Sequence, residues 1–325
     1  MPSVYLPPDE FTDGESLDFD LAADYLELKA FLSTDHQSLS NDIVSALDLG
    51  DSDIDRTSCD DLVAGAINRM KLRQDILVEA YPFAIDIDGD VISFIDGKSD
   101  YGKTAYLISL LLSNLRSLSP LIDCEELHPT EKEVAEFRKY FQYFATAAIA
   151  AEIQGPAWSF GFPRPDGTGF IQKLSEIWAV LKDGSVSPDP SSPAKPKDDG
   201  VDVFAWRKQS DGLPGFLLVA AQVATGKNWR DKSIKSNIDG IFQARWFSRW
   251  PVTEIVAYHV VPFACSDDDK FRDHVLLLGN ILHRLRLPRR VSEAVLIKDD
   301  VKIEAFDQLD KAENLICSYL DRVRI

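Results

Sequence analysis

Two strand-like stretches joined by a turn constrain the fold more than any other part of this sequence. VDVFAWR (201–207) alternates apolar and polar positions, SDGLPG (210–215) has the residue types of a turn, and GFLLVAAQV (215–223) is almost continuously apolar. A continuous apolar strand is typical of the buried centre of a sheet. These residues therefore predict a hairpin whose second strand lies inside the protein.

The first half of the chain predicts helices. Helical periodicity covers about 21–80, then 103–117 and 131–153, and a hairpin with a turn at Asp88-Gly89 separates the first of these ranges from the second. GPAWSFGFPRPDGTG (155–169) follows and predicts irregular structure, because its glycines and prolines interrupt a helix.

The second half predicts a mixture of strands and helices. A proline-rich loop at 183–200 precedes the hairpin. The other expected elements are a strand at 252–263 and helices at 168–182, 230–246, 268–284 and 304–323. We expect a mostly helical N-terminal region over residues 1–165 and an α+β or α/β domain over 166–325.

Composition narrows the class of protein. The net charge of −18 argues against a generic nucleic-acid binder, although the sign reverses locally within 195–235 and 283–290. No apolar run is long enough for a membrane span, and the N-terminal sequence predicts no signal peptide. The four cysteines form no CxxC pair, so we expect a cytoplasmic protein without membrane contact. The histidines share no ligand spacing, and His259 is interpreted as a packed core residue.

Two polar residues, one on each strand, predict a site at one end of the hairpin. Asp202 begins the first strand and Gln222 ends the second, so antiparallel pairing brings them to the same end of the hairpin. Two oxygen ligands suit a hard cation such as Mg²⁺ or Mn²⁺. The lysine-rich turn that follows could supply a positive charge beside a bound phosphate.

The run GVDVFAW…GFLLVAAQVATGKNWRDK resembles the PD-(D/E)XK, or restriction-endonuclease-like, nucleases in their GxD…Q branch, which occurs in restriction and anti-phage defence proteins. GPAWSFGFPRPDGTGF, just upstream, also resembles a stretch that accompanies this core in bacterial defence proteins. The resemblance covers roughly residues 155–265. It implies an αβββαβ core with a mixed central sheet and Mg²⁺-dependent hydrolysis of DNA phosphodiester bonds.

The resemblance also implies roles for individual residues. Asp202 matches the metal-binding Asp, Gln222 matches the Glu or Gln position, and Glu176 matches a helical carboxylate that serves as a further metal ligand.

The catalytic lysine departs from the family pattern. Ala224 stands where the lysine is expected, so Lys227 or Lys232 would have to replace it. The DNA-binding residues that we expect are Arg230, Lys235, Arg284, Arg286 and Arg289, and a helicase or sensor subunit is the expected protein partner.

Two alternatives remain open. In the first, the domain keeps the fold but does not cleave, and serves as a DNA-binding or assembly subunit of a defence complex. In the second, GKSDYGKT (97–104) is a P-loop and the protein binds a nucleotide. The sequence after this motif lacks the strand pattern that a P-loop fold requires.

The first sixty residues carry fifteen acidic and two basic side chains. We hypothesise that this acidic segment either covers the basic surface and holds the nuclease inactive, or docks a basic partner protein. In the first case the segment inhibits the enzyme. Deletion of residues 1–20 should then raise DNA affinity and cleavage at low salt, because a competing negative charge is removed. Unchanged affinity and cleavage in the truncated protein would exclude this role.

Overall fold

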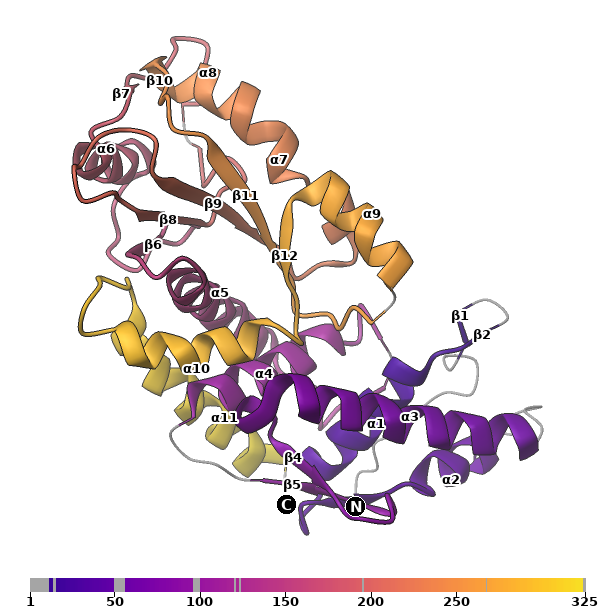
Figure 1. Cartoon of the computed structure of the whole chain (residues 1–325). Helices are drawn as coiled ribbons and strands as arrows, with labels where there is room; N and C mark the ends of the chain where they lie inside the picture. The colour runs from indigo at the N-terminus through magenta and orange to yellow at the C-terminus, as the bar shows by residue number, and fades with distance from the viewer. Residues whose placement is uncertain are drawn as a thin grey trace.

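The structure is a computed structural model that describes residues 12–13, 16–49, 56–95, 100–119, 121–122, 124–194, 196–266 and 268–323. A mixed five-stranded sheet and a layer of long helices lie against each other (Figure 1). The expectation of a fold that contains both helices and strands, with a mixed central sheet, is confirmed.

The central sheet has the strand order β12-β11-β9-β8-β6. Its strands are β6 (Ala157–Ser159), β8 (Val203–Arg207), β9 (Leu217–Val223), β11 (Ile255–Val260) and β12 (Asn280–Leu282). Strands β6, β8 and β9 pair antiparallel, whereas β11 runs parallel to both β9 and β12. The hairpin predicted from 201–223 is therefore present, and β9 is a central strand.

Helices cover both faces of this sheet. The alternate residues Val203 and Ala205 of β8 share a core with α5 (Glu131–Ile153), because neighbouring side chains of a strand point to opposite faces. On the other face, Phe204 of β8 shares a second core with α6 (Phe170–Leu181).

The helical layer is built from both ends of the chain. Its helices are α1 (Phe19–Leu32), α2 (Asp42–Leu49), α3 (Arg56–Leu77), α4 (Tyr101–Ser113), α10 (Leu287–Ile297) and α11 (Leu309–Val323), with α5 joining it to the sheet. Tyr319 of α11 stacks on Phe31 of α1 and meets Phe137 of α5 edge-on. One hydrophobic core therefore spans the boundary expected at residue 165.

Smaller sheets lie outside the central one. Strand β3 (Gln37–Leu39) pairs with β5 (Val91–Phe94), which forms the expected hairpin with β4 (Phe83–Ile85). The two remaining pairs join β1 (Thr12–Asp13) to β2 (Ser16–Leu17) and β7 (Ser185–Val186) to β10 (Phe247–Arg249).

The prediction of a single continuous helix at 230–246 is wrong, because the segment consists of several short helical turns. A 3-10 turn (Lys227–Asp231), α7 (Ile234–Asn237), a π turn (Ile238–Phe242) and α8 (Gln243–Trp246) follow one another. The apolar residues Ile234, Ile238, Phe242 and Trp246 recur every four positions, and all four are buried in the same core. A π turn has more residues per turn than an α-helix, so it keeps side chains spaced four residues apart on the same face. In a continuous α-helix of 3.6 residues per turn, these side chains would drift around the helix and away from the core.

Two other expectations require correction, and one helix was not predicted. The helix expected at 268–284 ends as α9 (Asp268–Leu278), because Gly279 adopts a φ of 90° and the chain continues as β12. The irregular stretch at 155–169 contains the edge strand β6. The basic cluster at 283–290 includes the start of α10, with Pro288 in its first turn.

A buried ionic network joins α1, α3 and α4 to the segment after β12. Glu27 of α1 accepts hydrogen bonds from Arg73 (2.8 Å), Tyr81 (2.8 Å) and Tyr106 (2.7 Å). Asp24, one turn earlier, pairs with Arg73 at 2.8 Å and with Arg284 at 2.5 Å. These residues are at most 6% exposed, so each charge depends on its partners for solvation.

Replacement of Arg73 by alanine should therefore lower the free energy of unfolding by about 3–5 kcal/mol, because it leaves Glu27 buried without its cation. Urea denaturation measures the change. Arg69→Ala is the matched control, since Arg69 lies on the same helix, is partly exposed and pairs with Asp20 at only 3.7 Å; its cost should stay below about 1 kcal/mol. Equal losses in both variants would contradict the role of this network.

Candidate functional site

Asp202 is held rigidly at the start of β8. Its main-chain N–H donates to Ala221 at 2.8 Å, and its carbonyl accepts from Phe160 and Gly161 at 2.7 and 2.9 Å. The carboxylate Oδ2 accepts from the Val223 N–H at 2.7 Å. The side chain is therefore fixed across the end of β9, as the hairpin geometry predicts.

A row of three polar side chains crosses the sheet at this end. Asp202 precedes Val203, which pairs with Ala221, so Asp202 lies beside Gln222 of β9. Gln222 is in register with His259 of β11. The row lies on the sheet face that packs against α6, between two apolar clusters.

The row contains buried polar atoms without partners. Within the described ranges, Gln222 Oε1 has no hydrogen-bond partner, and both ring nitrogens of His259 lack a hydrogen bond of normal geometry, although the Trp229 main chain lies close enough to one of them for a weak contact. A buried polar group without a partner costs about 1–3 kcal/mol. Such a cost at neighbouring positions on two strands is typical of a site that binds something.

The electrostatics of Asp202 are unusual for an aspartate. Burial raises the pKa of its carboxyl to about 7, and the negative charge of Asp198 raises it further. The Val223 N–H and the charge of Lys232 act in the opposite direction. Asp202 is therefore poised to change its protonation state near neutral pH.

His259 is neutral at physiological pH. Burial lowers the pKa of its imidazole to about 4, the charge of Lys232 lowers it further, and the Trp229 main chain opposes these effects. The charge of Lys232 thus acts on both ends of the polar row. The interpretation of His259 as a buried residue is confirmed, and its position beside Gln222 was not foreseen.

The sequence also gave no sign of Gln142. This residue of α5 donates to Ser159 Oγ at 2.7 Å, and its Oε1 faces Gly161. A Cβ atom at Gly161 would lie 2.3 Å from Asp202 Oδ1 and 2.5 Å from Gln142 Oε1, so only glycine fits between the two oxygens. Gln142 thus reaches the site from α5, the helix that precedes β6. A glutamine in a long helix is usually a surface residue, so no sequence signal distinguished it.

Two predicted site residues lie elsewhere. Glu176 is on the exposed side of α6, where it accepts a hydrogen bond from Gln172 at 3.0 Å, whereas Ile177 and Trp178 face the core. Lys227 lines a different cavity, of 470 Å³, and Arg230 lines the same cavity. Asp18, Asp20 and Asp24, at the start of α1, form part of its opposite wall. Of the two candidate lysines, Lys232 is the one whose charge acts on Asp202.

The predicted DNA-binding residues separate into three places. Arg230 is exposed beside His274, and Lys235 is exposed and donates to the Leu276 carbonyl at 3.0 Å. Arg284 is 1% exposed within the buried ionic network, which leaves no surface for a DNA contact. The remaining two, Arg286 and Arg289, line a pocket on the opposite face of β11.

The P-loop-like motif falls only partly within the described residues, because 97–99 lie outside them. Asp100 caps α4 and accepts from the N–H groups of Gly102 at 2.8 Å and Lys103 at 3.4 Å. The amides that would bind phosphate thus already face a carboxylate. A Cβ atom at Gly102 would lie 2.1 Å from Ser292 Oγ, so this glycine permits the packing of α4 on α10.

No group of three or more His, Cys, Asp or Glu side chains within the described part of the chain is arranged to hold a metal ion. The oxygens of Asp202 and Gln222 are the candidate ligands that remain. Among the helices that the structure describes, none is both long and apolar enough to cross a membrane. No protein-family model matches the chain, and comparisons with curated proteins and with solved structures find no match.

The raised pKa of Asp202 predicts a distinctive dependence of stability on pH. Between about pH 4 and 7 the folded protein holds a proton on Asp202 that the unfolded chain has released, so this residue destabilises the fold as pH rises. Asp202→Asn removes the effect. In metal-free buffer the stability of the variant relative to wild type should rise by more than about 1 kcal/mol from pH 4.5 to 8.

Chemical denaturation at both pH values tests this expectation. Asp166→Asn provides a control of opposite sign, because Lys173 and Thr168 hold the pKa of Asp166 at about 2 despite partial burial. That variant should be less stable than wild type across the same pH range. A pH-independent difference between Asp202→Asn and wild type would contradict the assignment.

Proposed function

We propose that this protein is a metal-dependent nuclease whose site is the end of the hairpin formed by β8 and β9. The observation that carries the proposal is the row of Asp202, Gln222 and His259 at one end of a mixed sheet. The charge of Lys232 lies near enough to lower the pKa of Asp202. Three antiparallel strands followed by a helical crossover to a parallel strand support the proposal, since this order agrees with the αβββαβ core that the sequence resembles.

In this proposal Asp202 and Gln222 would hold the metal ion. The unpartnered Gln222 Oε1 and the high pKa of Asp202 both fit a cation, because each would be relieved by a nearby positive charge. A bound Mg²⁺ would lower the pKa of its water and neutralise charge on the phosphate.

Other side chains would stabilise the phosphate charge and bind the DNA. Lys232 would stabilise negative charge on the scissile phosphate. Neutral His259, in register with Gln222 on the next strand, would leave the positive charge at the site to the metal ion and Lys232. Arg230 and Lys235 belong to the same segment as Lys232, are exposed, and would contact the DNA backbone. A role in anti-phage defence, with a helicase or sensor partner, follows from the sequence resemblance alone.

Cleavage of supercoiled plasmid in Mg²⁺ or Mn²⁺ tests this proposal. Wild-type protein should nick or degrade the plasmid, and Asp202→Asn should lower the rate at least about 100-fold, because the anionic ligand is lost. Lys232→Ala should lower it by a similar factor, whereas Lys227→Ala should retain most activity. At metal concentrations too low to saturate the site, the wild-type rate should rise with pH through about 7, because metal binding requires the ionised form of Asp202.

Two controls make the assay specific. Glu176→Gln should leave cleavage unchanged, because Glu176 is exposed on α6 and points away from the core. Lys103→Ala should also be neutral if the P-loop-like motif binds no nucleotide. Plasmid cleavage that survives Asp202→Asn would overturn the proposed site, since the activity would then have another source.

One observation favours a second candidate function. The proposed ligand set contains a single carboxylate and a neutral amide, and this weakens metal affinity. The same site could therefore bind DNA without cleaving it, as a subunit of a larger complex. DNA binding that is weakened by Arg230→Gln, together with no cleavage in either metal, would establish this function.

A further inference from the structure

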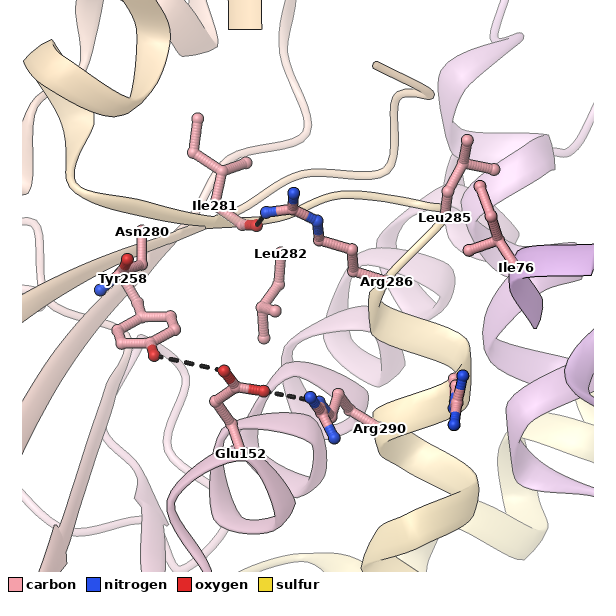
Figure 2. Close-up of a pocket in the computed structure, with 10 residues that line it drawn as sticks. Ile76, Glu152, Tyr258, Asn280, Ile281, Leu282, Leu285, Arg286 and Arg290 are labelled. Carbon is pink, nitrogen blue, oxygen red and sulfur yellow. Dashed lines mark hydrogen bonds and ion pairs between the residues drawn. The ribbon is translucent and has the colours of Figure 1, made fainter. Parts of the chain in front are cut away.

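A pocket of 430 Å³ lies on the other face of β11, between the sheet and the helical layer (Figure 2). The end of α5, strands β11 and β12, and the start of α10 form its walls. Its polar lining residues are Glu152, Tyr258, Asn280, Arg286, Arg289 and Arg290. Ile76, Leu282 and Leu285 provide apolar surface.

The pocket has an excess of positive charge in a protein of net charge −18. Three guanidinium groups and one carboxylate line it. The carboxylate of Glu152 is already engaged, because it pairs with Arg290 Nε at 2.5 Å and faces the Tyr258 hydroxyl at 3.5 Å (Figure 2). Arg289 is 60% exposed, and its ion pair within the described part of the chain is with Glu293 at 3.3 Å. Glu293 lies just outside the pocket lining and also pairs with Arg290, so it offsets part of the positive charge.

The arginines stand where their charge is unfavourable. Arg286 is the residue before α10, and Arg289 and Arg290 lie in its first turn. A helix N-terminus carries a partial positive charge, so each cation there costs up to about 1 kcal/mol. The first amide of α10 is already satisfied, because the Leu287 N–H donates to the His283 carbonyl at 2.9 Å, and Pro288 has no N–H. An anion in the pocket would offset the electrostatic cost of the arginines.

The neutral groups also suit a phosphate ligand. Burial and the charge of Glu152 raise the pKa of Tyr258 to about 12, so its hydroxyl remains a hydrogen-bond donor. The Asn280 amide lies opposite Tyr258, since the two residues are in register on β12 and β11. Arginine is the side chain that best matches the paired oxygens of a phosphate.

We propose that this pocket binds a phosphate group through Arg286, Arg289 and Arg290. The group can belong to a free nucleotide or to a nucleic-acid backbone, because both offer the same oxygens. The inference does not rest on the proposed hydrolysis, since Asp202 and Gln222 lie on the opposite face of the sheet.

Calorimetric titration of the full chain with inorganic pyrophosphate, at low salt and without metal, tests the proposal. We expect saturable binding that Arg289→Gln weakens at least 10-fold. Arg289→Lys should retain part of the affinity, because it keeps the charge and loses the paired donors. Arg138→Gln, an exposed arginine of α5 outside this pocket, should bind like wild type.

Competition identifies the source of the phosphate. Displacement of pyrophosphate by a mononucleotide, and not by a short duplex, would assign the pocket to a free ligand; displacement by the duplex would assign it to the DNA backbone. Asp202→Asn should bind pyrophosphate normally, which separates this pocket from the proposed metal site. Absence of saturable binding, or equal affinity in wild type and Arg289→Gln, would overturn the proposal.

Discussion

The ionic contacts of Asp24 and Glu27 hold the two layers of this protein in a fixed relation. Both carboxylates lie on α1, yet their cations come from α3 and from the residue two positions after β12. Buried ion pairs gain little net stability over apolar packing, but they are costly to break. The network therefore specifies where the edge of the sheet meets the helical layer. Both the pocket at α10 and the cavity beside Lys227 form along this junction.

Long stretches with clear hydrophobic periodicity predicted the long strands and helices of the fold. Strands β8, β9 and β11 were recognised from sustained apolar character, and α5 from long helical periodicity. Strands β6 and β12 were missed because three residues are too few to show a period of two. Helix α10 was not predicted, since the sequence at 283–290 was interpreted only as a basic cluster. The association of α11 with the N-terminal helices was also missed, because sequence periodicity shows that a helix has a buried face and not which helix covers it.

The residues of the candidate site that could be predicted are those whose polarity differs from that of the neighbouring residues in the sequence. Gln222 stands out as a polar residue in an apolar strand, and Asp202 follows from the pairing of that strand. Gln142 and His259 do not stand out from their neighbours in this way. A glutamine in a long helix and a histidine in a buried strand are both common in proteins without any site at that position. The choice between Lys227 and Lys232 depended on the local path after β9, where a 3-10 turn directs Lys227 toward α1. Propensity alone does not predict that path.

The return of α10 and α11 to the N-terminal helices has a consequence for synthesis. Helix α4 is buried on nearly all sides, and its Ser113 meets Arg284 across a separation of 171 positions. As the chain leaves the ribosome, α4 emerges long before the helices that cover it. In a nascent chain of about two hundred residues, the face of α4 that α10 and α11 later cover is therefore still exposed, and an apolar face of this kind is a surface that chaperones bind. The helical layer closes only when the last forty or so residues have been made, after every strand of the central sheet.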